Sequence, residues 1–233
     1  MSEAEPNIAK QAKDIAEAAD TSVDTVQKLA AFLDSVFGNV VSNSFGLLSD
    51  KLAYYRLDKA IALQEAVDEK LRKRGVNKRY VPVSFGLPII EKATVEESPI
   101  LQEKWANLLA NARDATYNKP LRRSFSTMLA DMEPVDAKIL DILVREYLAM
   151  PSDGDSHLFV TETLVKGYKL PAHVVENAVR NLMRLSLIKP GVVTGGISIG
   201  THAVSSYKDT EMVQVTGLGV DFFRAVNDAP SKS

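Results

Sequence analysis

The sequence predicts a mainly α-helical fold, in which an N-terminal helical domain precedes a smaller α+β domain with a long β-hairpin. Apolar residues recur at three-and-four spacing over most of the 233 residues, which is the pattern of amphipathic helices. Near the C-terminus, a glycine-rich segment is followed by a stretch with Val213 and Val215 on one face, which indicates a hairpin. A hydrophobic content of 45% is enough to fill a substantial core.

The N-terminal half is predicted to be helical throughout. Residues 7–20 suit a solvated, Ala-rich helix that frays, and a Thr-Ser pair then caps a second helix that ends at Gly38. A long amphipathic helix starts near residue 49 and ends where Gly75 suits a C-cap.

The helix that is best defined by the sequence lies in the middle of the chain. It follows extended chain marked by Pro82 and Pro88, which leads into a short helix over 87–93. Ser98 is then an N-cap and Pro99 takes the first helical position, where the missing N–H of proline is not needed. One stripe of this helix consists of Leu101, Trp105, Leu108 and Ala112. The only tryptophan is therefore predicted to lie in the core.

From residue 134 the predicted order of elements changes to helix, short strand, two helices, hairpin, helix. The strand is "HLFV", the two helices cover 161–167 and 171–185, and the hairpin covers 188–216. This order resembles a winged helix with the hairpin as an unusually long wing. The second domain is therefore expected to be winged-helix-like.

These elements predict four segments along the chain. A mobile N-terminal helix covers 1–20, the helical domain 21–133, the winged-helix-like domain 134–228, and a disordered tail 229–233.

Several pieces of sequence between Pro82 and Leu140 resemble one bacterial family. They include "ATVEE", "LQEKWANLLANARD" and "FSTMLADMEPVDAKIL". These pieces are similar to the Abi-alpha (abortive infection alpha) family, a group without a settled biochemical activity, and Pro99 is a departure from its acidic lead-in. The residues expected in the core of the motif are Trp105, Leu108, Leu109, Ala112 and Leu140. The resemblance implies a role in defence against phage and carries over no catalytic residue.

The composition narrows the functional classes. With 28 Lys and Arg against 30 Asp and Glu, the net charge of -2 provides no overall attraction to nucleic acid or to an anionic membrane. The absence of cysteine excludes disulfides, thiolate nucleophiles and thiolate metal sites, and it fits a reducing cytoplasm. The polar, acidic N-terminus differs from a signal peptide. We therefore expect a cytoplasmic protein.

The sequence contains no recognisable catalytic constellation. The three histidines, His157, His173 and His202, have no metal-ligand spacing. The "GGISIG" segment is followed by Thr201 and His202, whereas a phosphate-binding loop needs a Lys and then a Ser or Thr. We expect no enzymatic activity, no cofactor, no metal and no small-molecule substrate.

Nucleic-acid binding is a second hypothesis for the C-terminal domain, because winged helices often place their third helix in the major groove. The polar residues on that helix and at the wing ends are Asn177, Arg180, Arg184, Lys189 and Lys208. Residues 135–233, however, carry 10 Lys and Arg against 11 Asp and Glu. Since phosphate neutralisation supplies much of the affinity for DNA, this balance favours protein contacts.

Another basic cluster lies in "KLRKRGVNKRY", next to Tyr80. Its cations are Lys70, Arg72, Lys73, Arg74, Lys78 and Arg79. They could bind phosphates or lipid headgroups. The alternative is that the cluster is only solvated and favoured by the dipole at the end of a helix.

The segment 29–50 suggests a membrane-directed or self-associating effector as a third class. Polar residues interrupt it, so it fails the test for a bilayer-spanning helix. Gly38 and Gly46, with small polar residues between them, nevertheless permit close helix packing. The alternative is a helical hairpin that seals the first domain.

The sequence thus favours a phage-defence protein that acts through a protein partner or self-association. The alternatives are a DNA-binding regulator that uses Arg180 and Arg184, and a toxic effector that reaches the membrane on activation.

Overall fold

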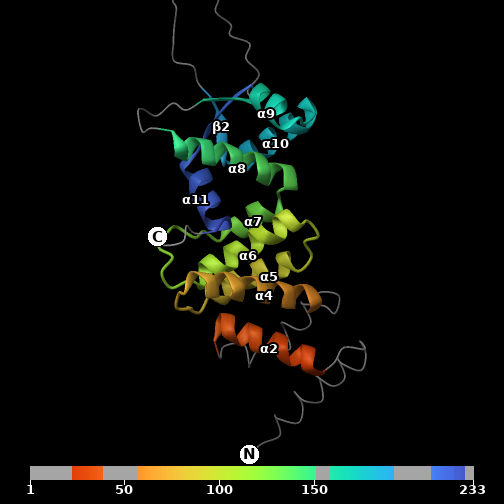
Figure 1. The fold of residues 1–233 in the computed structure, drawn as a ribbon, viewed down its shortest axis with the longest axis vertical. Coiled ribbons are helices and arrows are strands. Elements are labelled where there is room, and N and C mark those ends of the chain that lie inside the picture. Colours follow the sequence, from red (N-terminus) through yellow and green to blue (C-terminus); the bar gives the residue numbers. More distant parts are fainter. Residues whose placement is uncertain (1–22, 39–56, 151–157, 192–210, 229–233) are drawn as a thin grey trace, which may run out of the picture. The chain divides into compact units, whose positions relative to one another are not determined.

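The computed structural model describes residues 23–38, 57–150, 158–191 and 211–228. Over these ranges the chain is mainly helical with a small antiparallel sheet in its C-terminal part, which confirms the predicted class (Figure 1). The chain forms two compact units, Met1–Asn118 with Asp228–Ser233, and Lys119–Asn227. The predicted helix at 7–20, the tail at 229–233 and the greater part of the wing lie outside the described residues.

The described helices of the first unit are α2 (Val23–Phe37), α4 (Leu57–Arg74), α5 (Val83–Ala93) and α6 (Pro99–Arg113). Helix α6 packs on both α4 and α5, and α2 also packs on both. Because two helices cover it, α6 is buried well beyond the predicted stripe. The buried residues include the polar side chains of Lys104, Asn107, Asn111 and Arg113.

Arg113 joins three helices of the first unit. Its side chain is only 1% exposed. At the end of α2, Nη2 donates to the carbonyl of Ser35 at 3.0 Å and lies 3.2 Å from its hydroxyl. Nη1 lies 3.5 Å from Oδ1 of Asp68 on α4. Burial lowers the pKa of Arg113, and the charge of Asp68 opposes that shift.

The link between α4 and α5 is held by backbone hydrogen bonds. The N–H of Arg79 donates to the carbonyl of Arg113 at 2.7 Å, and the N–H of Val81 donates to the carbonyl of Val36 at 2.8 Å. Helix α5 begins at Val83, one turn before the predicted start, so Pro88 lies inside it. The early start follows from Pro82, whose carbonyl already accepts from the N–H groups of residues 85 and 86.

The second unit contains α7 (Ser124–Ala130), α8 (Pro134–Ala149), β1 (Phe159–Val160), α9 (Thr161–Tyr168), α10 (Ala172–Arg184), β2 (Ile188–Pro190), β3 (Met212–Val215) and α11 (Gly217–Val226). From α8 onward this is the predicted order of helices and strands. The strands pair antiparallel in the order β1-β3-β2, with Val213 opposite both Phe159 and Pro190. The assignment to the winged-helix class stays a prediction.

The core of the second unit forms where α8 packs on α10 and α11. Phe125 of α7 meets Phe222 of α11 edge to face, with ring centroids 5.4 Å apart. This contact helps to group α7 with the second unit, whereas the boundary predicted near Glu133 would leave α7 with the first. The predicted limits of the two domains stay a prediction.

The start of α8 is a buried polar junction. Pro134 takes the first helical position, and Glu133 and Asp136 form a reciprocal capping box. From α10, Nδ2 of Asn181 donates to Oδ2 of Asp136 at 2.6 Å and to the carbonyl of Asp131 at 2.9 Å. Asp136 is 3% exposed, and burial raises its pKa above the ordinary 3.8, although its hydrogen bonds oppose that shift.

We predict that Arg113→Met destabilises the first unit by about 1–3 kcal/mol, because the Ser35 carbonyl loses its donor, Asp68 keeps only Lys78, and the guanidinium contacts are not replaced. Urea unfolding followed by the fluorescence of Trp105, which is buried in the same helix, measures the change. The matched control is Arg72→Met, since Arg72 is 73% exposed and should matter by less than about 0.5 kcal/mol. Equal losses in the two variants would show that burial of Arg113 contributes nothing.

We predict that Asp136→Asn removes a pH-dependent part of the stability of the second unit. Because the folded-state pKa of Asp136 is raised, its contribution is fully present below about pH 3.8 and is lost as the pH rises through the folded-state pKa. The free energy of unfolding of the natural chain, minus that of the variant, should therefore fall with rising pH. Urea titrations followed by far-UV circular dichroism at several pH values measure it. A difference that rises with pH would mean that the junction stabilises the charged carboxylate.

Candidate functional site on helices α4 and α6

The basic cluster predicted from the sequence lies at the C-terminal end of α4 and in the link that follows. Three of its cations form the last turn of α4, where the helix dipole favours positive charge. Gly75 ends the helix with a positive φ of 61°, as expected for a C-cap. The side chains of the cluster fall into two groups, those that point outward and those that face α6.

The outward cations are paired with neighbouring acids or a carbonyl. Arg72 and Lys73 both contact Glu69, whose pKa is lowered chiefly by the hydrogen bonds from these two side chains. Nζ of Lys78 lies 2.7 Å from Oδ1 of Asp68. Nε of Arg79 donates to the carbonyl of Ala112 at 2.8 Å, at the end of α6.

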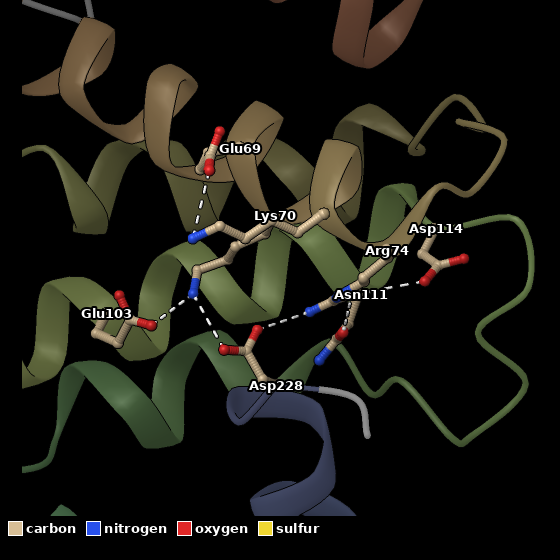
Figure 2. A network of polar contacts seen from close by, with 8 residues as sticks. Glu69, Lys70, Arg74, Glu103, Asn111, Asp114 and Asp228 are labelled. Atoms are coloured by element: carbon tan, nitrogen blue, oxygen red, sulfur yellow. Dashed lines mark hydrogen bonds and ion pairs between the residues drawn. The ribbon is translucent and has the colours of Figure 1, made fainter. Parts of the chain in front are cut away.

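Lys70 and Arg74 form the inward part of the cluster, one helical turn apart (Figure 2). Their side chains are 12% and 10% exposed. Lys70 pairs with Glu103 of α6, and Nη1 of Arg74 donates to Oδ1 of Asn111 at 2.7 Å. Nη1 of Arg74 also lies 3.5 Å from Oδ2 of Asp114, a carboxylate that is 3% exposed.

Asp228, which belongs to the first unit, contacts both inward cations. Its Oδ1 accepts from Nη2 of Arg74 at 3.1 Å, and its Oδ2 lies 3.5 Å from Nζ of Lys70. Figure 2 shows the carboxylate between the two cationic side chains. The two oxygens of one carboxylate thus bridge the pair.

The sequence predicts the cations of this network but not their partners. These partners are the acids Asp68, Glu69, Glu103, Asp114 and Asp228 and the amide of Asn111. One signal was present, because Glu103 and Asn111 lie two turns apart on α6. For Asp228 no local signal exists, since it lies 158 residues from Lys70 in the sequence.

Chemically, this arrangement is a nearly neutral network rather than an open basic patch. Each of the six cations except Arg79 has a carboxylate within ion-pair distance. An incoming phosphate or lipid headgroup would have to compete with these carboxylates. Binding of phosphates or lipids by this cluster stays a prediction.

The residues predicted to contact nucleic acid lie on α10 and β2 of the second unit. Asn177 and Lys189 are exposed. Nη2 of Arg180 lies 2.9 Å from Glu176, and Arg184 contacts Asp131 at 3.1 Å. Lys208 lies outside the described residues, so the structure brings only part of the predicted surface together.

The residues predicted for the motif core are deeply placed. Each of them is at most 5% exposed: Trp105, Leu108, Leu109, Ala112 and Leu140. His173 is exposed, and the other two histidines lie outside the described residues. Over the described ranges, no three His, Asp or Glu side chains come close enough to hold a metal ion.

An open hollow of about 220 Å³ lies between α4 and α6. Four of its nine lining residues are alanines, and Lys59, Gln102 and Glu103 are the polar members. These side chains lack the pairing of a nucleophile with a base that covalent catalysis needs. Among the described helices, none has the length and apolar character needed to cross a membrane.

Comparison with known proteins places both units in one family. The sequence model described as "Abortive infection alpha" matches residues 55–226, which run from just before α4 to the end of α11. The curated proteins and the solved structures that were compared give no match. Since the matched residues make up well over half of the sequence, the chain belongs to the abortive infection alpha family.

Proposed function

We propose that the protein takes part in abortive infection, in the cytoplasm, by contacting a protein partner or a second copy of itself, without catalysis of its own. Membership of the abortive infection alpha family carries this proposal. Because the matched residues include helices of both units, the role is assigned to the whole of this region rather than to one unit.

The cations of both units are paired with acids, and this pairing supports contacts with protein over contacts with a polyanion. In the second unit, Arg180 is paired with Glu176 and Arg184 with Asp131. In the first unit, Lys70 and Arg74 are similarly compensated. A polyanion is attracted by uncompensated positive charge, whereas a protein partner can recognise a surface of mixed charge.

DNA binding through α10 is a second candidate, and one observation favours it. The order of helices and strands from α8 to α11 is the order predicted for a winged helix. In such folds the helix in the position of α10 enters the major groove. Exposed Asn177, Arg180 and Arg184 lie on that helix.

The membrane-directed effector is a third candidate, and it rests on segment 29–50. Residues 39–50 of that segment lie outside the described residues, so it stays a hypothesis from the sequence. Partition with phospholipid vesicles tests it, and insertion of an Asp at Val40 should abolish partition if the segment enters the bilayer.

We predict that expression of the chain in a phage-sensitive bacterium lowers the number of plaques while the infected cells die. This combination distinguishes abortive infection from resistance, in which infected cells survive. Plaque counts and survival of infected cells at high multiplicity measure the two effects. Unchanged plaque numbers, with the chain shown to be abundant and folded, would contradict the proposal.

For DNA binding, we predict that any affinity of the natural chain changes little when Arg180 and Arg184 are both replaced by alanine. If α10 instead reads DNA, the double variant should lose affinity, and the slope of log affinity against log salt should become shallower by about 1.8. Fluorescence anisotropy with a labelled duplex measures both quantities. The control is the double alanine variant of Arg122 and Arg123, two exposed arginines of the same unit.

A further inference from the structure

Asp228 binds its two cations in the way that a separate carboxylate ligand would. Its oxygens are divided between Arg74 and Lys70, at 3.1 and 3.5 Å. The Asp228 side chain is 60% exposed, whereas the two cations are 12% exposed or less. The two cationic side chains are therefore packed into the first unit, and the Asp228 carboxylate contacts them from the solvent side.

Arg74 is held in place by buried partners other than Asp228. Lys70 has one other acidic partner, Glu103 of α6, whose side chain is 57% exposed. Asn111, which is fully buried, positions the Arg74 guanidinium together with Asp114. Asp114 is itself fixed, because its Oδ1 accepts from the N–H and the hydroxyl of Thr116 at 2.8 and 2.7 Å. Contacts of this kind hold a binding site ready for its ligand.

The charge of these partners selects the class of anion. Without Asp228, the positive charges of Lys70 and Arg74 are balanced by the negative charges of Glu103 and Asp114. Asp228 shows that one carboxylate can bridge the two cations while Glu103 and Asp114 remain paired with them. A phosphate dianion would bring a second negative charge next to Glu103 and Asp114, which is unfavourable.

We propose that Lys70 and Arg74 form a carboxylate-binding site, which Asp228 fills from within the same chain. The ligand that competes with Asp228 is one carboxylate, supplied either by a small organic acid or by an acidic residue of a polypeptide. The site is additional to the function proposed above and does not depend on it.

Asp228 is suited to being displaced. An ion pair with a carboxylate that is mostly in solvent is weak, because water screens it and competes for both partners. A tethered group of this kind competes with an effective concentration on the order of millimolar. A free carboxylate at tens of millimolar can therefore exchange with it, and removal of Asp228 should leave the site open.

The test uses the full chain with Asp228→Ala, and thermal unfolding is followed by Trp105 fluorescence. Sodium acetate, the peptide acetyl-Gly-Asp-Gly-amide and inorganic phosphate are each compared with sodium chloride at equal ionic strength. At about ten times its dissociation constant, a carboxylate should raise the midpoint of the variant by about 3–6 °C and that of the natural chain by much less. A response to acetate alone indicates a small organic acid, and a stronger response to the peptide indicates a polypeptide.

Asp221→Ala is the matched control. It also removes one negative charge, but from a residue of α11 that is not part of the network around Lys70 and Arg74. Adding Lys70→Gln to Asp228→Ala should abolish the response to carboxylate, and the side-chain Nε–Hε resonance of Arg74 should move when acetate is titrated into Asp228→Ala. Equal responses in the Asp228 and Asp221 variants would overturn the proposal. A larger effect of phosphate than of acetate, specific to the Asp228 variant, would overturn the assignment to carboxylates.

Discussion

The first unit depends on the need to provide partners for one buried charge. Leaving the guanidinium of Arg113 unpaired inside the protein would be strongly unfavourable. Its partners come from the end of α2 and from the middle of α4, and its own carbonyl accepts from Arg79 in the link. The positions of three helices and of the chain between α4 and α5 are thereby coupled to one residue. Contacts between apolar side chains alone would allow these helices to slide, whereas the hydrogen bond to Ser35 and the ion pair with Asp68 restrict them.

Compensation of charge within each unit is the second general feature. The inward cations of α4 meet acids of α6 and Asp228, and the arginines of α10 meet Glu176 and Asp131. These pairs agree with a net charge of only -2. A polyanion is attracted over a long distance only by a net positive electrostatic field. Pairs of opposite charge cancel that field at a distance. The charge distribution of each unit therefore favours recognition by local fit, as we propose for Lys70 and Arg74.

Much of the helical architecture could be predicted, because helix signals are local. Pro99 at the start of α6 and Gly75 at the end of α4 each act within one turn. The predicted start of α5 is too late for a related reason. Pro88 is a local signal that indicates a later start, whereas the helix begins at Val83. For the candidate site, the cations were visible as a run in the sequence. Their partners were not, because Glu103, Asp114 and Asp228 are far from α4 along the chain.

The sequence by itself determined that the chain is mainly helical, that Trp105 lies in a core, and that the motif belongs to the abortive infection alpha family. Only the tertiary structure decided that α6 is buried around most of its circumference and that Lys70 and Arg74 share Asp228. The physical reason is that periodicity and capping involve neighbours a few residues apart, whereas an ion pair is set by distance in space. Whether a cation is available to a ligand is therefore a property of the packing around it.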